Sequence, residues 1–327
     1  MSCHRPGRSP SRLVAYAIVA AIAVACEPSA RDELLRGAST LSPYDALVLS
    51  TFGRSSPEVM WIDSPGHAAE LLSSDPRTTG RVDWITCGQG VVAYLLGKGI
   101  DVVVLATVYA SDSTFLPVWR TGHPPAPGER TLFVPASTVE FLLRRFLARS
   151  DIPLSELRIN NRHGQSLGAI ERALLEPASS TDAIDFAVLP DPFLSDVLTK
   201  MPQSYVSGPP GLYDFYYCLV TRRQRLRGRE KSFLDLVNRL AAADTLLRAR
   251  GVDPKLQPFV FRPSARFFVI DNAQLQLRPV QLAAAISDEL SYLVEAYPSQ
   301  FRSVPRVSDA IDPSYLAREA PQRVVYR

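Results

Sequence analysis

An uninterrupted apolar run at residues 101–109 constrains the fold of this chain most strongly. Its sequence, DVVVLATVY, is rich in β-branched residues and carries no charge after the first position. A strand with continuous rather than alternating hydrophobicity is covered on both faces, as in a parallel sheet flanked by helices. The run therefore predicts an α/β fold built on a parallel sheet.

Shorter β-type runs and helical runs alternate on both sides of that strand. The pattern starts again after Ser111-Asp112-Ser113. The length of 327 residues also exceeds the size at which one hydrophobic core keeps growing. Together these features predict two α/β lobes, with the chain crossing between them near residues 110–115 and 207–217.

Residues 44–52 fit two structures. Their composition favours a strand, whereas the flanking Pro43 and Gly53 favour a helix. The other segments are assigned from period and flanking residues. The predicted strands are 33–39, 58–63, 82–86, 101–109, 115–119, 130–134, 157–159, 183–189, 213–221 and runs within 260–270, and the predicted helices are 66–74, 90–96, 138–148, 166–175, 233–250 and 279–295.

The N-terminus has the pattern of an export signal. Three arginines precede an uncharged apolar run at residues 13–25, which is too short as a helix, at about 20 Å, to cross a hydrocarbon core of about 30 Å. The tetrad Ala23-Val24-Ala25-Cys26 resembles the lipobox of bacterial lipoproteins. This resemblance implies that residues 1–25 are removed, that Cys26 is diacylated, and that residues 26–32 form a tether. The alternatives are an uncleaved anchor and a chance apolar stretch.

Charge argues against a nucleic-acid partner. Loss of Arg5, Arg8 and Arg12 with the leader changes 36 basic and 33 acidic residues to 33 of each. Nucleic-acid binding needs a basic face, and no such face is evident. A basic cluster remains at residues 222–231, which is interpreted as a solvated loop or, alternatively, as a docking patch for anionic lipid or a partner protein.

Cysteine and histidine usage predicts neither a metal site nor a cofactor. No CxxC or His/Cys cluster is present. With Cys3 in the leader and Cys26 assigned to lipid, Cys87 and Cys218 remain. An oxidising compartment permits a disulfide between them, and the sequence leaves that question open.

One segment matches the G-x-S-x-G nucleophile elbow of α/β-hydrolases. The match is Gly164-Gln165-Ser166-Leu167-Gly168, followed by a predicted helix. In that fold the general-base histidine follows the serine in the chain, and no histidine follows His163 here. The motif therefore does not predict a catalytic serine.

A second segment resembles a dinucleotide fingerprint. Gly88, Gly90 and Ala93 follow a predicted strand and open a helix. Only eight residues separate Ala93 from the next strand, which is short for the usual crossover. The glycines are interpreted instead as a tight turn or as an anion-binding helix N-terminus.

Several of these segments together resemble ABC-transporter substrate-binding proteins. The similarity is to the NMT1/nitrate–sulfonate–taurine branch, with the two-lobe type II periplasmic-binding-protein fold. It covers most of residues 33–250. It is carried by Gly80-Arg81-Val82-Asp83, Gly88-Gln89-Gly90, Gly99-Ile100-Asp101-Val102-Val103-Val104, Val134-Pro135-Ala136-Ser137-Thr138, and the segment from Asp182 to Pro192.

The resemblance implies a Venus-flytrap action in which hinge closure holds a ligand between lobes. Lobe I would comprise residues 33–112 plus 213–327, and lobe II residues 113–212. Residues 44–52 would be a helix after the first ligand loop. His163 would be either a ligand contact or an exposed loop residue. The implied ligand-binding residues are Ser39, Thr40, Tyr44, Thr86, Gly88, Gln89, Tyr109, Ser137, Thr138, Asn161 and Asp191.

The function that this resemblance implies is capture of a small polar solute and its delivery to an inner-membrane ABC permease. The protein would not be an enzyme, and it would be held at the extracytoplasmic face of a membrane by the lipid on Cys26. The alternatives are a solute-sensing or structural lipoprotein and an exported enzyme on the same fold. The sequence does not name the solute.

Overall fold

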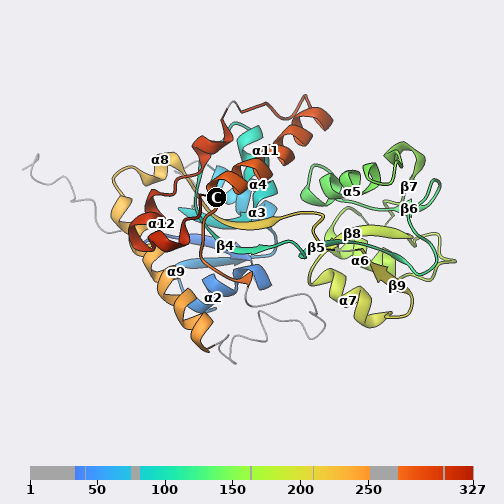
Figure 1. Cartoon of the computed structure of the whole chain (residues 1–327), viewed down its shortest axis with the longest axis horizontal. Coiled ribbons are helices and arrows are strands. Elements are labelled where there is room, and N and C mark those ends of the chain that lie inside the picture. The colour runs from blue at the N-terminus through green and yellow to red at the C-terminus, as the bar shows by residue number, and fades with distance from the viewer. Residues whose placement is uncertain are drawn as a thin grey trace, which may run out of the picture. The chain divides into compact units, whose positions relative to one another are not determined.

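Two five-stranded sheets, each packed against helices, form the framework of the protein (Figure 1). The computed structural model describes residues 34–40, 42–74, 82–162, 164–208, 210–250, 272–304 and 306–326. The predicted export signal, Cys26, the tether, His163 and the runs predicted within 260–270 lie outside the described residues. Among the residues that are described, no helix is long and apolar enough to cross a membrane.

The first sheet, which we call sheet A, combines strands that come before and after the second sheet in the chain. Its three N-terminal strands are parallel to one another, and β10 pairs antiparallel with β3 and β4. In spatial order the strands are β2 (Val59–Ile62), β1 (Gly37–Thr40), β3 (Trp84–Gly88), β10 (Phe215–Arg222) and β4 (Val102–Ser111).

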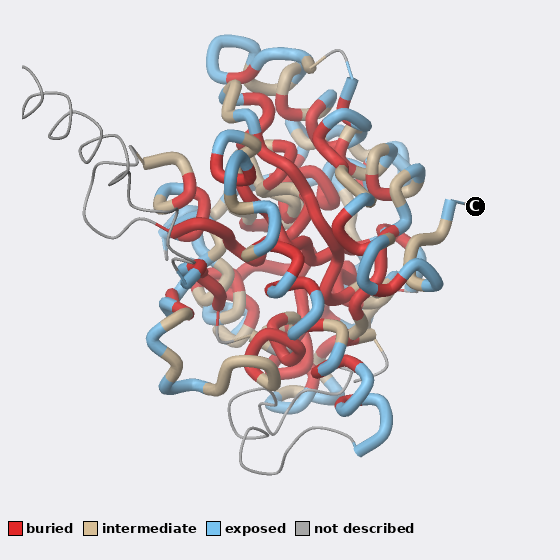
Figure 2. Tube along the Cα trace, turned by 90° about the vertical axis from the view of Figure 1, so that its left-hand side faces the viewer, coloured by how far each residue is buried: buried red, intermediate tan, exposed pale blue. Residues whose placement is uncertain are grey.

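The apolar run at residues 101–109 is a buried strand, β4, as predicted. Figure 2 shows buried segments running through the interior of the fold. The prediction that β4 pairs in parallel is wrong. Its neighbour β10 runs in the opposite direction because the chain has returned from the second sheet before adding that strand. Single bridges to Ile311 and Gln276 cover the other edge of β4, so burial on all sides explains its continuous hydrophobicity.

The second sheet, sheet B, is formed by residues between the two chain crossings. The chain leaves sheet A after Ser111 and returns to it at Phe215. Strand β5 pairs antiparallel with β8 and β9, and β6 pairs parallel with β7 and β8. In order the strands are β7 (Arg158–Ile159), β6 (Arg130–Thr131), β8 (Phe186–Pro190), β5 (Phe115–Arg120) and β9 (Tyr205–Ser207).

The helices follow the predicted order, with α7, α8, α12 and strand β9 as elements that the sequence patterns did not predict. The ambiguous segment 44–52 is helical, beginning with the 3-10 turn Pro43–Asp45. The helices of the sheet A part are α2 (Ala46–Phe52), α3 (Pro65–Ser73), α4 (Gln89–Gly97), α8 (Arg223–Leu226), α9 (Glu230–Arg250), α11 (Pro279–Ala296) and α12 (Ser314–Glu319), and those of the sheet B part are α5 (Thr138–Ala148), α6 (Leu167–Leu175) and α7 (Phe193–Lys200).

Serine caps explain where two helices of the sheet B part begin. Ser137 precedes α5, and its Oγ accepts the amide of Glu140 at 3.4 Å. Ser166 precedes α6 and accepts the amide of Ala169 at 3.1 Å. Such bonds satisfy amides that have no partner within a helix. The serine of the hydrolase-like motif is therefore a helix cap in this structure.

The basic cluster at residues 222–231 is not the solvated loop that its composition predicts. Part of it forms α8, and Arg225 is only 4% exposed, donating to the carbonyl of Leu72. The guanidinium of Arg229 pairs with buried Asp83 at 2.6 Å. A buried carboxylate is stabilised by a paired cation, and the side chain of Arg229 therefore lies against Asp83 and not in solvent.

The two remaining cysteines are free, buried thiols. Cys87 on β3 and Cys218 on β10 are register partners on adjacent antiparallel strands. Burial raises the pKa of both thiols, which disfavours the reactive thiolate.

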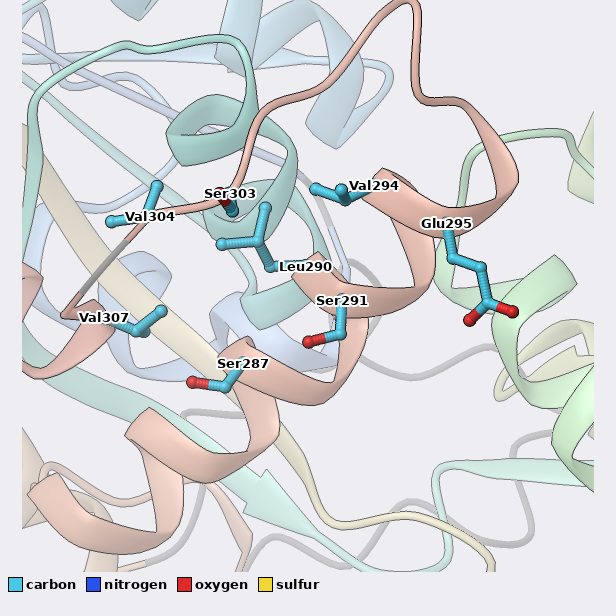
Figure 3. Close-up of a pocket in the computed structure, with 8 residues that line it drawn as sticks. All are labelled: Ser287, Leu290, Ser291, Val294, Glu295, Ser303, Val304 and Val307. Carbon is cyan, nitrogen blue, oxygen red and sulfur yellow. The ribbon is translucent and has the colours of Figure 1, made fainter.

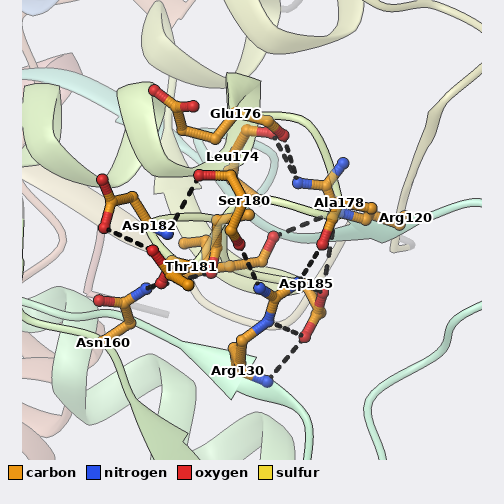
Figure 4. Close-up of polar contacts among 12 residues, drawn as sticks. Arg120, Arg130, Asn160, Leu174, Glu176, Ala178, Ser180, Thr181, Asp182 and Asp185 are labelled. Carbon is orange, nitrogen blue, oxygen red and sulfur yellow. Dashed lines mark hydrogen bonds and ion pairs between the residues drawn. The ribbon is translucent and has the colours of Figure 1, made fainter.

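Buried charges connect the strands of sheet B (Figure 4). Asp185 accepts hydrogen bonds from the backbone and the guanidinium of Arg130, and its carboxylate lies 3.8 Å from Arg120 Nε. Arg120, 8% exposed, also donates to the carbonyls of Leu174 and Glu176 at the end of α6. Burial alone would raise the pKa of Asp185, but the bonds from Arg130 lower it to about 2.

We expect Asp185→Asn to lower the free energy of unfolding at neutral pH by about 2 kcal/mol. The wild-type carboxylate contributes this stability above the unfolded-state pKa and loses it as pH falls through the folded-state value of about 2. Urea unfolding at pH 7 and pH 2 measures the effect. Equal stability losses at both pH values would contradict an ionic contribution, and the exposed neighbour Asp182→Asn serves as the control.

Candidate functional site

A buried carboxylate surrounded by hydroxyl groups lies where β1 and β3 end. Asp45, the last residue of the 3-10 turn, is fully buried. Ser39 and Thr86 each donate to its Oδ1 at 2.5 Å. Thr40 and Ser42 donate to its Oδ2, at 2.5 and 2.9 Å. Parallel strands β1 and β3 end at the same edge, which brings their hydroxyls to one acceptor.

A cluster of aromatic rings adjoins this network. The ring of Tyr44 lies 5.1 Å from that of Tyr109, 5.3 Å from that of Phe215 and 5.4 Å from that of Tyr217. The hydroxyl of Tyr217 lies 3.0 Å from Thr40 Oγ1, which links the rings to the Asp45 network. Further rings continue the cluster: Phe115 lies 5.0 Å from Phe215 and 6.0 Å from Tyr213.

Contacts between the two sheets' loops occur at this cluster. The hydroxyl of Tyr44, from the loop after β1, donates to the backbone carbonyl of Asp191, which directly follows β8. Asp191 is 3% exposed, and its peptide bond to Pro192 is cis. The side chain of Tyr44 therefore joins the sheet A and sheet B parts directly.

A second carboxylate joins the two parts at the other end of the ring cluster. Glu289 on α11 accepts hydrogen bonds from Thr138 Oγ1 on α5 at 2.8 Å and from the hydroxyl of Tyr213. The backbone of Gly90 lies against this pair, since a Cβ there would be 2.1 Å from Thr138 Oγ1. Glycine is required at this position because of that close approach, which identifies the role of one glycine in the fingerprint-like motif.

Helices α5 and α11 make one further polar contact. The hydroxyl of Tyr297, just past α11, donates to Oε2 of buried Glu140 at 2.5 Å. It also accepts the amide of Ala136 at 3.3 Å. Two carboxylates, one on each helix, thus hold the same helix pair together.

Burial dominates the electrostatics of the two carboxylates at the ends of the ring cluster. Desolvation raises the pKa of Asp45, and the four hydroxyl donors offset part of that rise. Desolvation also raises the pKa of Glu289 to about 7, despite the bonds from Tyr213 and Thr138. Within the described ranges, no basic side chain forms an ion pair with either group. Both carboxylates are therefore held by neutral donors alone.

The structure brings most of the predicted site residues together. Ser39, Thr40 and Thr86 surround Asp45, whereas Tyr44, Tyr109 and Asp191 meet around the rings. Thr138 contacts Glu289, and a Cβ on Gly88 would lie 2.9 Å from the ring of Phe215.

Three predicted residues have other surroundings. Gln89 is fully buried and makes two bonds to the backbone at the start of β10, to Asp214 and Tyr216. Ser137 caps α5. Asn161 lies on an exposed loop, and its side chain makes no hydrogen bond to any described residue. Gln89 and Ser137 support the framework around the cluster, whereas Asn161 is not connected to it by any such bond.

Sequence reasoning did not identify Asp45, Phe215, Tyr217, Tyr213 and Glu289 as site residues. For the aromatic residues a signal was available, since positions 213, 215 and 217 alternate along the strand and so face the same side. Asp45 and Glu289 carry no comparable local signal, because their partners are distant in sequence.

One surface pocket, lined by described residues, lies elsewhere. A cavity of about 300 Å³ opens between α11 and the segment after it (Figure 3). None of the residues that line it was predicted as a site residue, and it is separate from the ring cluster. No group of His, Cys, Asp and Glu among the described residues is arranged to hold a metal ion. The lining residues are Ser287, Leu290, Ser291, Val294, Glu295, Ser303, Val304 and Val307.

Comparison with known proteins identifies the fold. No protein-family model and no curated protein matches the sequence. The ligand-binding component of an ABC-type import system from Staphylococcus aureus superposes with a TM-score of 0.62 at 14% identity, over 88% of this chain and 98% of that one. The periplasmic aliphatic sulphonate binding protein of Escherichia coli gives 0.60 at 15% identity, over 80% and 87%.

A third structure states the fold by name. A Candida albicans gene product with the generic periplasmic binding protein structural fold gives a TM-score of 0.53 at 9% identity, over 89% of this chain and 95% of that one. The chain therefore has the periplasmic-binding-protein fold, and the predicted fold class is confirmed.

Proposed function

We propose that this chain is the solute-binding component of an ABC importer, of the type that its sequence resembles. The observation that carries the proposal is the meeting of residues from both sheets at one aromatic and polar cluster. Tyr44 contacts Asp191, and Thr138 contacts Glu289, across the two parts. Structural neighbours described as ligand-binding or sulphonate-binding proteins of such systems support it.

In this proposal, residues 33–112 plus 213–327 form lobe I and residues 113–212 form lobe II. The two chain crossings act as the hinge. Opening separates Tyr44 from Asp191 and Thr138 from Glu289, which exposes the ring cluster to a solute. Closure around the solute restores contacts of this kind and supplies the shape that a permease recognises.

The proposed location is the extracytoplasmic face of a membrane. The basic, apolar and small-residue sections of residues 1–26 support export and lipid attachment at Cys26. A lipid tether would keep the binding protein close to its permease in the inner membrane. The alternatives, a sensing or structural lipoprotein and an exported enzyme, share the fold and differ in the use made of a bound ligand.

A thermal-shift screen of the purified protein tests the binding function. The panel contains small organic cations, oxyanions and neutral polar compounds. A ligand at about 100 times its Kd adds roughly 2.7 kcal/mol of stability, and we expect a rise in Tm of roughly 5 °C or more for a selective hit.

Two tyrosine variants locate the binding site. Tyr44→Phe removes the hydroxyl that reaches Asp191 and should reduce the shift. Tyr94→Phe, whose ring packs on Phe301 away from the cluster, should leave it unchanged. If no compound in the panel raises Tm, the solute-binding function is wrong, and a structural lipoprotein becomes the better explanation.

A further inference from the structure

We propose that the ligand of this site is an organic cation, a protonated or quaternary amine, and that Asp45 determines the preference. The inference rests on the proposed solute-binding function and specifies its substrate class. It follows from three features of the site: hydroxyl donors already committed to a carboxylate, a wall of aromatic rings, and buried negative charge without a positive partner.

The hydroxyl donors of the site are occupied by the protein's own carboxylate. An oxyanion needs hydrogen-bond donors, and Ser39, Thr40 and Thr86 are three of the predicted ligand-binding residues that carry them. All three donate to Asp45 at 2.5 Å, the short distance typical of charge-assisted O–H···O bonds. An oxyanion entering here would have to compete for these donors and would meet a carboxylate of like charge. The donor set therefore disfavours sulfate, nitrate and sulfonate groups.

The neighbouring surface suits a cation. Four aromatic rings pack together here, those of Tyr44, Tyr109, Phe215 and Tyr217. The ring of Tyr44 lies 5.1–5.4 Å from the other three, and the ring of Phe215 lies 6.0–6.1 Å from those of Tyr109 and Tyr217. The faces of aromatic rings attract ammonium groups electrostatically, and the attraction strengthens when water is excluded. Asp191 lies at the same cluster, through its carbonyl contact with Tyr44. Hinge opening would part these rings and admit the ligand.

The buried carboxylate of Asp45 lacks a counter-ion among the described residues. Asp45 is 0% exposed, and its four side-chain hydrogen-bond donors are neutral hydroxyls. Buried carboxylates are ordinarily paired with a cation, as Asp83 and Asp185 are in this chain. A cationic ligand would supply the missing positive charge.

Isothermal titration with matched ligands tests the inference on the wild-type protein. One pair is choline and its neutral carbon isostere, in which a tert-butyl group replaces trimethylammonium. The other probes are tetramethylammonium, a primary alkylamine, an aromatic amine, sulfate, nitrate and ethanesulfonate. We expect at least one amine to bind, and to bind roughly tenfold or more tightly than its neutral isostere.

Variants then assign the preference to Asp45. Asp45→Asn keeps an acceptor for the hydroxyls and removes the charge, and it should weaken binding of the cation by roughly tenfold or more. Asp182→Asn, an exposed carboxylate of the sheet B part, is the control and should leave affinity unchanged. If Asp45→Asn does not fold, the comparison of isosteres on the wild-type protein still decides the question.

The outcomes separate this inference from the proposed function. An oxyanion or a neutral compound that binds the wild-type protein more tightly than every amine leaves the solute-binding function intact and overturns the preference for a cation. Failure of all three ligand classes to bind overturns both. Amine binding that Asp45→Asn leaves unchanged overturns the role of Asp45.

Discussion

Asp45→Ala should lower the free energy of unfolding by about 3 kcal/mol. The substitution removes the acceptor of four hydroxyls, and Ser39 and Thr86 are themselves fully buried. A buried donor without an acceptor costs more than the net contribution of the bond that it lost. The hydroxyls of Ser39 and Thr86, 2.7 Å apart, can pair with each other, and this limits the loss. Urea unfolding at pH 7 measures it.

Two variants test whether the expected loss of stability is specific to the carboxylate of Asp45. Asp63→Ala removes an exposed carboxylate just past β2 and should change stability by less than about 0.5 kcal/mol. Asp45→Asn retains a carbonyl acceptor and should cost less than Asp45→Ala. Equal stability of wild type and Asp45→Ala would show that the hydroxyls do not depend on this carboxylate.

Glu289→Gln should stabilise the protein above pH 7 and remove one component of its pH dependence. The folded protein raises the pKa of Glu289 from 4.5 to about 7. Between these values the folded state retains a proton that the unfolded state has lost, so the stability contributed by this group falls as pH rises. It is fully present below the unfolded-state pKa and lost above the folded-state pKa. The contribution of Glu289 to the free energy of unfolding therefore falls by about 3 kcal/mol between the two pH limits.

The measurement is the stability of wild type and variant across pH 4 to 8. The difference between the two curves should change through that range and become constant above it. Glu295→Gln, which removes an exposed carboxylate near the end of the same helix, should retain the wild-type slope. Parallel curves for wild type and Glu289→Gln would contradict the raised pKa. The direction is opposite to that at Asp185, where acid removes stability.

Local patterns were sufficient for most elements of the fold. Helix α5 occupies residues 138–148 as predicted, because a serine cap, an early glutamate and an amphipathic pattern all agree there. The apolar run of β4 was also identified correctly as a strand. Its antiparallel pairing was not, since continuous hydrophobicity reports that a strand is covered and does not report the direction of its neighbour.

The residues of the candidate site were likewise predicted only in part. The family resemblance predicted hydroxyls at the ends of strands, such as those of Ser39 and Thr86, as ligand-binding groups. Their common acceptor was missed because nothing in the residues around Asp45 distinguishes it from a solvent-exposed aspartate. Glu289 was missed for the same reason, since its partners Thr138 and Tyr213 lie 151 and 76 positions away.

Short-range order and the α/β class follow from residue patterns alone, because period, caps and composition act within a few neighbouring residues. The direction in which β10 pairs, the burial of Arg225 and Arg229, and the assembly of four hydroxyls around Asp45 were decided by the folded chain. Each of these depends on a partner that is remote in sequence and becomes a neighbour only when the sheets assemble. Burial then sets the electrostatic character of Asp45 and Glu289, since desolvation exists only in the assembled interior.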